Sequence, residues 1–306
     1  MSRAMVIVNP LARGGVSRAK WPLVSYWLKK AGLSFDYAFT EHTGHGIELA
    51  SEAANTGYEL IIAVGGDGTV NEVVNGIVGE DGRGRAILGI ISAGTVGDFV
   101  HTLGIPRDVI KACQLFSNYK QITIDLGSVE YIKDDQKVRR FFINTAGMGF
   151  VTDVVGGAHK RLKFIGGTIP YVIGMIPTVF SYQNKDVVLE IDGERREERD
   201  FVVVINNGRY LGGGKVFPDA DPCDGVLDVA LVGDMGKLEA LWSFPRFYRG
   251  THIGRPKIKL CQAKSVSVES PQRLLVQMDG EIVGEVPASV GIIPSALNIA
   301  IGESDD

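Results

Sequence analysis

Residues 60–76, LIIAVGGDGTVNEVVNG, join a strand-like run to a helix-like run through a turn that is rich in glycine. The apolar run of residues 60–64 ends at Gly65 and Gly66, and a helix is expected to follow. Such a turn presents backbone N–H groups to phosphate, because a helix N-terminus carries about half a positive charge. An acid, Asp67, stands in the middle of this turn, where an unpaired carboxylate would oppose a bound phosphate.

Two common phosphate-binding motifs do not fit this turn. A Walker loop needs Lys and Ser or Thr after its last glycine, whereas Asn71 and Glu72 follow here. A dinucleotide fingerprint needs a third glycine at the place of Asn71. The acid is explained if Mg²⁺ lies between it and phosphate, or if it accepts a proton from an attacking hydroxyl. The turn therefore indicates Mg-nucleotide phosphoryl transfer, and the alternative is that Asp67 only caps the helix.

The same order of strand, glycine-bearing turn and helix recurs in the first part of the chain. Its strands are expected within residues 4–10, 35–41, 59–66 and 86–94. Continuous apolar strands that alternate with helices predict an α/β domain with a doubly wound, mainly parallel sheet over residues 1–124. Ligands bind at the carboxyl ends of the strands in such sheets. The turns expected at that edge are residues 9–15, 40–46, 65–69 and 92–98.

The pattern changes after about residue 125, where strand-like runs follow one another with mostly short turns between them. This predicts a β-rich sandwich domain over residues 125–291, with residues 154–182 as a helical exception. The last strand-like run, within residues 292–306, is expected to return to the first domain. The charged run ERREERD, residues 194–200, is interpreted as a solvated turn.

The composition of the 306-residue chain is that of a globular protein, with 45% hydrophobic and 22% charged residues. The net charge of −4 provides no basic field, so no nucleic-acid partner is expected. Cys113, Cys223 and Cys261 are few and far apart, which favours a reducing compartment over a disulfide framework. The apolar run near the N-terminus is too short for a signal peptide and is interpreted as the first strand.

Residues 164–184 carry no charge and are long enough to span a bilayer. Pro170 and Pro177 argue against an isolated span, because nothing nearby would satisfy the freed backbone groups. A buried core helix and a wall for an apolar substrate are the two alternatives.

Several ordered segments resemble one known family. They are VNPLARGG (8–15), FTEHTGHGIELA (39–50), GGDGTVNEVVNG (65–76), SAGTVGDFVHTLGIP (92–106), INTAGMGFVTDVV (143–155), VFPDADPCDGVLDV (216–229) and MDGEIV (278–283). Together they resemble the diacylglycerol kinase catalytic-domain family, the soluble bacterial lipid kinases related to sphingosine kinases. NAD kinases share the glycine-rich turn but are not expected to carry the later segments. The resemblance implies a fold like that of NAD kinases and diacylglycerol kinases.

The resemblance also implies the roles of individual residues. Residues expected to contact the nucleotide, ATP, are Asn9, Thr40, Gly66, Asp67, Gly68, Thr69, Val70, Asn71, Glu72 and Thr95. Asp67 and Asp98 resemble the acids around the catalytic Mg²⁺ and the transferring phosphoryl group. Glu281 resembles the family's general base, which would take the proton of a lipid hydroxyl such as that of diacylglycerol. Glu281 is therefore expected to face the turns of the first domain across an interdomain cleft.

A second Mg²⁺ site is implied in the acidic loop DADPCDGVLD. The resemblance assigns a structural Mg²⁺ to Asp221, Asp224 and the backbone carbonyl of Val226. Carboxylates and carbonyls are the oxygen ligands that this ion prefers. The alternative is a solvated acidic turn built on Asp224 and Gly225.

The chain departs from the family pattern beside Asp98. Gly97 stands where the family usually has Asn, and His101 where it usually has Arg. Two alternatives stay open, and the departures at Gly97 and His101 motivate the second. One is a kinase for another acceptor, such as phosphatidylglycerol, a sphingoid base or NAD, and the other is a weakly active, lipid-binding regulatory homologue.

The partner implied by a lipid substrate is a membrane surface. No acid occurs between Glu239 and Glu269, and basic and aromatic residues are interleaved there. They are Arg246, Arg249, Arg255, Lys257, Lys259 and Lys264, with Trp242, Phe244, Phe247 and Tyr248. This composition suits an anionic interface and predicts a cytoplasmic protein that makes transient peripheral contact with the inner membrane surface. The alternative is a solvated face with core aromatics. A homodimer also stays open.

Overall fold

The computed structural model describes residues 3–12, 15–92, 97–161 and 176–302. The chain forms two compact units. Unit 1 comprises residues 1–125 with 295–306, and unit 2 comprises residues 126–294.

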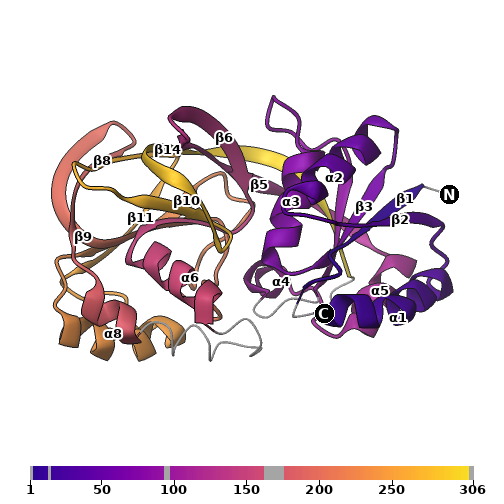
Figure 1. Ribbon diagram of the computed structural model, residues 1–306, viewed down its shortest axis with the longest axis horizontal. Coiled ribbons are helices and arrows are strands. Elements are labelled where there is room, and N and C mark those ends of the chain that lie inside the picture. Colours follow the sequence, from indigo (N-terminus) through magenta and orange to yellow (C-terminus); the bar gives the residue numbers. More distant parts are fainter. Residues whose placement is uncertain (1–2, 13–14, 93–96, 162–175, 303–306) are drawn as a thin grey trace. The chain divides into compact units, whose positions relative to one another are not determined.

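Unit 1 is built on a parallel sheet (Figure 1). Its strands are β1 (Ala4–Val8), β2 (Phe35–Phe39), β3 (Leu60–Gly65), β4 (Ile87–Ser92) and the end of β14 (Glu281–Ile301). The order across the sheet is β2-β1-β3-β4-β14. β1 pairs parallel with β2 and β3, and β4 pairs parallel with β3 and, through Leu88 and Ile299, with β14. The parallel pairing predicted from the sequence is confirmed for these strands.

Helices cover both faces of this sheet (Figure 1). They are α1 (Val16–Lys30), α2 (His45–Asn55), α3 (Asp67–Ile77), α4 (Asp98–Thr102) and α5 (Val109–Gln114), and the 3-10 turn η1 (Leu115–Ser117) follows. Leu28 of α1 and Cys113 of α5 share an apolar cluster with Val6 and Ile62 of the sheet. The pair α2 and α3 lies on the opposite face. All of β3 is buried, as expected for an apolar strand between two helical layers.

α2 and α3 approach each other closely at a glycine. A Cβ atom at Gly76 of α3 would lie 2.4 Å from the carbonyl oxygen of Ile47 in α2, so no larger residue fits. This contact fixes α3 against α2 behind the glycine-rich turn.

Unit 2 is built mainly from antiparallel strands. They are β5 (Lys120–Lys133), which begins in unit 1, β6 (Gln136–Phe142), β7 (Thr145–Gly149), β8 (Lys185–Ile191), β9 (Glu194–Asn206), β10 (Leu227–Gly233), β11 (Ile258–Ala263), β12 (Ser265–Glu269), β13 (Leu275–Met278) and the first part of β14. The strands β9-β7-β13-β14-β12-β8 pair in this order, and β8 pairs again with β9. The sheet therefore closes on itself. β10 and β11 extend it from β9, whereas β5 pairs with β14 and β6.

The core of unit 2 lies inside this closed sheet. Alternate residues such as Val203 and Ile205 of β9, or Val276 and Met278 of β13, belong to one buried apolar cluster. They face the same side because successive strand side chains point to opposite faces. The prediction that the second domain consists mainly of β-strands is confirmed.

Helices pack on the outside of unit 2. α6 (Phe150–Arg161), α8 (Lys237–Arg249) and the helical residues 176–181 cover a second apolar cluster that includes Phe150, Phe201 and Ala240. Most of the uncharged stretch from residue 164 lies outside the described residues. Among the helices that the structure describes, none is long and apolar enough to cross a bilayer.

The interpretation of residues 194–200 as a solvated turn is wrong. These residues form the first half of β9 and pair along their whole length with β8. The turn lies just before them, at Asp192 and Gly193, which both have positive φ. The charged side chains up to Arg199 are largely exposed, whereas Asp200 is buried. Long-range pairing with β8, which composition does not reveal, makes this run a strand.

Candidate active site

The predicted edge of unit 1 is formed where its parallel strands end. Asn9 follows β1, and its backbone N–H donates to the carbonyl of Val64 in β3 at 3.0 Å. Thr40 follows β2, and its N–H donates to the carbonyl of Val8 at 2.9 Å. Both residues thus extend the parallel hydrogen bonding by one step. Thr95, a predicted nucleotide contact, lies outside the described residues.

Asn9 and Thr69 are joined by their side chains. Asn9 Nδ2 donates to Thr69 Oγ1 at 3.0 Å, while Asn9 Oδ1 accepts from the N–H of Leu11 at 3.0 Å. A Cβ atom at Gly65 would lie 2.4 Å from Thr69 Oγ1, so the turn needs glycine to let Thr69 reach Asn9. The residue after β1 is therefore joined through its side chain to the first turns of α3.

Asp67 opens α3 but does not cap it. The N-cap of α3 is Gly66, whose backbone is extended and which supplies no side-chain hydrogen bond. Asp67 lies in the first turn, and its Oδ2 accepts from the backbone N–H of Gly97 at 3.2 Å. Gly66, and not Asp67, thus occupies the N-cap position of α3. The carboxylate connects the turn after β3 to the start of α4.

Gly97 uses a conformation that favours glycine. Its φ of 65° and ψ of 49° are left-handed, and it forms the N-cap of α4, which starts with Asp98. A Cβ atom at this position would lie 3.2 Å from Ser92 Oγ. Asn is among the few other residues that tolerate this conformation. The departure from the family's Asn therefore preserves the backbone geometry beside Asp98.

Glu72 holds the loop that follows β2. Its buried carboxylate accepts from the N–H of Gly44 at 2.7 Å through Oε1 and from the N–H of Gly46 at 3.0 Å through Oε2. A Cβ atom at Gly46 would lie 2.6 Å from Oε2. Glu72 thus ties α3 to the loop that begins at Thr40. Glu72 was predicted to contact the nucleotide. In the structure, its two carboxylate oxygens accept hydrogen bonds from the backbone N–H groups of Gly44 and Gly46.

Val70 and Asn71 have side chains that are turned into the protein. Val70 is buried, and so is Asn71, whose Oδ1 accepts from Asn75 Nδ2 at 3.2 Å. A contact between Val70 and a nucleotide would therefore be made by its backbone.

The donor set at this edge fits a Mg-nucleotide. The N-cap residue of α3 is a glycine, so no side chain of that residue competes with phosphate oxygens for the backbone N–H groups at the helix start. Asp67 and Asp98 each stand in the first turn of a helix, and carboxylates are the hard oxygen ligands that Mg²⁺ prefers. The described residues are thus compatible in kind with such a group.

Glu281 is the first residue of β14 in unit 2. It pairs with Met278 across a tight turn formed by Asp279 and Gly280, both with positive φ. The buried Asp279 carboxylate accepts from the N–H groups of Ile143, Asn144 and Thr145 at 2.9–3.0 Å.

These bonds fix the turn to the connection between β6 and β7. Sequence analysis missed this role, although Asp followed by Gly is a turn signal. The expected approach of Glu281 to unit 1 stays a prediction.

The acidic loop of unit 2 is folded by its own carboxylates. Asp221 Oδ1 accepts from the N–H of Cys223 at 3.0 Å, and Asp224 Oδ1 accepts from the N–H of Val226 at 3.1 Å. Burial, with Asp224 and Asp219 nearby, raises the pKa of Asp228 to about 6. Within the described ranges, no group of three or more His, Cys, Asp or Glu is placed to hold a metal ion. Mg²⁺ here would combine two carboxylates with backbone carbonyl and solvent oxygens, which suits its chemistry.

Both halves of the chain match known families. Residues 3–129 match the model described as the diacylglycerol kinase catalytic domain, and residues 147–301 match the YegS C-terminal NAD kinase beta sandwich-like domain. The chain is 32% identical to a diacylglycerol kinase of Staphylococcus carnosus (strain TM300) over 294 residues, which cover 94% of this chain and 91% of the relative. It is also 32% identical to a diacylglycerol kinase of Bacillus subtilis (strain 168), covering 94% and 92%.

The chain belongs to the diacylglycerol kinase family. A crystal structure of a putative diacylglycerol kinase from Bacillus anthracis str. Sterne has the same fold, with a TM-score of 0.79, 25% identity and coverage of 99% of this chain and 98% of that one. A second structure of a putative diacylglycerol kinase from that organism gives a TM-score of 0.76 at 25% identity, covering 99% of each chain. The resemblance recognised in the motifs is thus confirmed over nearly the whole chain.

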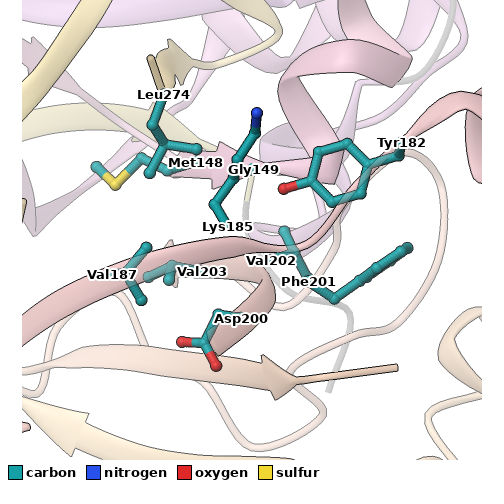
Figure 2. Close-up of a pocket in the computed structure, with 10 residues that line it drawn as sticks. All are labelled: Met148, Gly149, Tyr182, Lys185, Val187, Asp200, Phe201, Val202, Val203 and Leu274. Carbon is teal, nitrogen blue, oxygen red and sulfur yellow. The ribbon is translucent and has the colours of Figure 1, made fainter. Parts of the chain in front are cut away.

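This member of the diacylglycerol kinase family has a pocket in unit 2 that sequence analysis missed. Figure 2 shows its lining, which combines apolar side chains with Tyr182, Lys185 and Asp200. Among the described residues, neither carboxylate oxygen of Asp200 nor the Tyr182 hydroxyl has a hydrogen-bond partner. Burial, and secondly the charge of Glu198, raises the pKa of Asp200 to about 7. The feature of the sequence that could have indicated this pocket is the position of Asp200, the last residue of the charged run 194–200 on β9.

Proposed function

We propose that the chain is an ATP-dependent, Mg-dependent lipid kinase that transfers the γ-phosphate to the hydroxyl of a lipid such as diacylglycerol. Membership of the diacylglycerol kinase family supports the reaction class, and relatives named diacylglycerol kinase support the acceptor. The observation that carries the proposal is the start of α3, where the N-cap is the glycine Gly66 and Asp67 lies in the first turn. A helix start that attracts phosphate and an acid that attracts Mg²⁺ form a complementary pair.

The chemistry assigns one task to each group. The lipid hydroxyl oxygen attacks the γ-phosphorus, a new O–P bond forms, and the bond between the γ-phosphorus and the β,γ-bridging oxygen breaks to release ADP. Glu281 accepts the hydroxyl proton as general base. Asp67 and Asp98 would hold Mg²⁺, which neutralises charge on the phosphates when it is bound. Asn9, Thr69 and Glu72 keep the surrounding loops in place through the hydrogen bonds described above.

A structural Mg²⁺ on Asp221, Asp224 and the carbonyl of Val226 is part of the proposal. The two carboxylates lie in one short loop, and the neighbouring Asp228 has a pKa raised by its burial and by the charge of Asp224, which a cation would counteract. The site would thereby stabilise the loop of unit 2 between β9 and β10.

The proposal is tested by transfer of labelled γ-phosphate from ATP with Mg²⁺ to a panel of hydroxyl lipids in mixed micelles. The panel contains diacylglycerol, phosphatidylglycerol and a sphingoid base, with NAD as a soluble acceptor in a separate reaction. Label in diacylglycerol that depends on Mg²⁺ is the expected result. Label confined to another acceptor would replace the substrate and keep the reaction. ATP binding without transfer to any acceptor would overturn the proposal in favour of a regulatory homologue.

A further inference from the structure

α8 presents large apolar side chains to solvent. Leu238 and Trp242 are 71% and 74% exposed and lie one helical turn apart on the outer side of the helix. The neighbouring helical residues 176–181 repeat this arrangement with Ile176 and Phe180, which are 49% and 51% exposed. Large apolar side chains that gather in this way mark interaction sites.

These four exposed side chains lie on two neighbouring helical segments, and we call them together the α8 patch. Lys237 at the start of α8 donates a hydrogen bond from Nζ to the carbonyl of Phe180. Asn184, just beyond the helical residues, donates to the carbonyl of Met235 at 3.3 Å. The two helical segments are therefore directly connected at the patch.

The opposite sides of both segments are anchored in unit 2. Val179 and Ala240 are buried in the same apolar cluster, and Phe244 and Phe247 pack against it. The sequence predicted Phe244, Phe247 and Trp242 as part of one membrane face. In the structure Phe244 and Phe247 pack against the core, whereas Trp242 is largely exposed. The patch stands on a fixed platform, so a partner would meet preformed side chains and lose little entropy in ordering them.

Positive charge surrounds the patch. Arg246 and Arg249 lie in the last turn of α8, and Lys237 opens the helix. Two other lysines of the basic stretch are neutralised by ion pairs. Lys257 pairs with Glu239 at 2.6 Å, and Lys259 pairs with Glu198 at 2.8 Å. Across the described parts of the chain, no ion pair is formed by the three cations Arg246, Arg249 and Arg255. Arg246 instead donates to the carbonyl of Trp242. The exposed acid Asp234, which accepts a hydrogen bond from Asn184, lies at the same end of α8 as Lys237. Counted with Lys237, Arg246 and Arg249, it leaves the charge beside the patch positive.

We propose that the α8 patch docks on an anionic bilayer, with Leu238 and Trp242 entering the headgroup region and Arg246 and Arg249 facing lipid phosphates. This inference rests on the proposed function, because a kinase of diacylglycerol meets its acceptor in a membrane. Trp is favoured at membrane interfaces, and cations beside apolar side chains match a negatively charged lipid surface. A protein partner would have to supply an acidic rim around an apolar socket.

Flotation with lipid vesicles tests the inference without using kinase activity. Wild type is compared with Leu238→Ser/Trp242→Ser and with Arg246→Glu/Arg249→Glu, on phosphatidylcholine vesicles with and without phosphatidylglycerol. The matched controls lie on α1, where Leu23 and Tyr26 are 41% and 58% exposed. They are Leu23→Ser/Tyr26→Ser for apolar loss and Arg18→Glu/Lys29→Glu for charge reversal.

The expected result is a loss of at least about tenfold in partitioning to phosphatidylglycerol vesicles for either α8 variant, with the α1 controls unchanged. On vesicles without phosphatidylglycerol, wild type and Arg246→Glu/Arg249→Glu should partition equally. Wild type that does not float on anionic vesicles, or α8 variants that float like wild type, would overturn the inference.

Two further readouts distinguish docking of the α8 patch from a loss of kinase activity and from a purely electrostatic contact. Transfer to diacylglycerol in detergent micelles tests the proposed function alone, and the α8 variants are expected to keep it there. The second readout is the fluorescence of Trp242 in a variant in which Trp21 and Trp27 are replaced by Phe. Brominated acyl chains should quench this fluorescence if Trp242 enters the bilayer, whereas a purely electrostatic contact would leave it unquenched. A different result would assign the patch to a second copy of the chain instead. In that case wild type would not bind vesicles but would self-associate with increasing concentration, and Leu238→Ser/Trp242→Ser would remove the self-association.

Discussion

The carboxylate of Glu72 accepts a hydrogen bond from the backbone N–H of Gly44 at 2.7 Å, and this bond spans two segments that are distant in sequence. A second bond to the N–H of Gly46 makes the contact two-pronged. Charged acceptors strengthen such bonds, and the loop they hold begins at Thr40. The last acid of the motif GGDGTVNE therefore positions the turn that carries a candidate nucleotide contact.

Replacing Glu72 by Ala should loosen that turn. Two backbone N–H groups lose their acceptor, which costs about 1–3 kcal/mol of unfolding free energy and raises the KM for ATP. Urea unfolding and steady-state kinetics measure the two effects. Glu52→Ala, at an exposed position of α2 beyond its first turn, is the matched control and should change neither. An unchanged KM for ATP in Glu72→Ala would contradict the positioning role.

Gly97 offers a test of backbone conformation. Because its φ is 65° and a Cβ atom would lie 3.2 Å from Ser92 Oγ, Gly97→Ala should lower the unfolding free energy by about 1–2 kcal/mol. Gly97→Asn should cost less, since Asn tolerates the left-handed region. Denaturant unfolding of the two variants side by side measures the difference. Equal losses would show that conformation does not decide the residue at this position.

Asp200 predicts a pH-dependent stability. Its pKa is raised from 3.8 to about 7, so the folded chain keeps a proton that the unfolded chain releases near pH 4. The folded state binds more protons between these values, and stability therefore falls as the pH rises from about 4 to about 7. Asp200→Asn removes this dependence and should be more stable than wild type at pH 8, by on the order of a few kcal/mol. Near pH 4 the two should be similar.

Thermal unfolding across this pH range measures the effect, with Glu197→Gln on the exposed side of β9 as the control. A Tm difference between Asp200→Asn and wild type that stays constant with pH would show that Asp200 ionises normally.

Magnesium should stabilise the acidic loop without nucleotide. A ligand that binds only the folded state raises the Tm, so titration with Mg²⁺ should shift the Tm of wild type upward. Asp221→Asn/Asp224→Asn should lose most of that shift, whereas Asp219→Asn, an exposed acid in the same loop, should keep it. Equal shifts in all three proteins would place the stabilising ion elsewhere.

The local features of the fold could be predicted from the sequence because they depend on neighbours in the chain. The apolar run before Gly65 and the glycine-rich turn predicted β3 and α3, and both occur there. The closed sheet of unit 2 depends on pairing between distant strands. β9 meets β7, β8 and β10, and no local pattern states those partners. This is why the charged run at 194–200 was mistaken for a turn.

The candidate site follows the same division. Asp67 and Asp98 could be located from their motifs, since each follows a strand in a recognisable turn. The contacts of Glu72 with Gly44, and of Asp279 with Ile143, join segments that sequence spacing does not connect. Burial of Asp200 likewise follows from packing, because the charged residues that precede it on β9 are largely exposed. Residue types indicated the chemistry, and tertiary contacts decided which side chains position the others.

The most direct test of the central claim is transfer of labelled γ-phosphate to diacylglycerol, measured for wild type, Asp67→Asn and Glu281→Gln under identical conditions. The account predicts label in the lipid for wild type and a loss of at least about a hundredfold in kcat for each variant, since each removes a group assigned to the transition state. Circular dichroism confirms that the variants are folded. Transfer by either variant at the wild-type rate would contradict the assigned chemistry, and no transfer by folded, ATP-binding wild type would contradict the kinase itself.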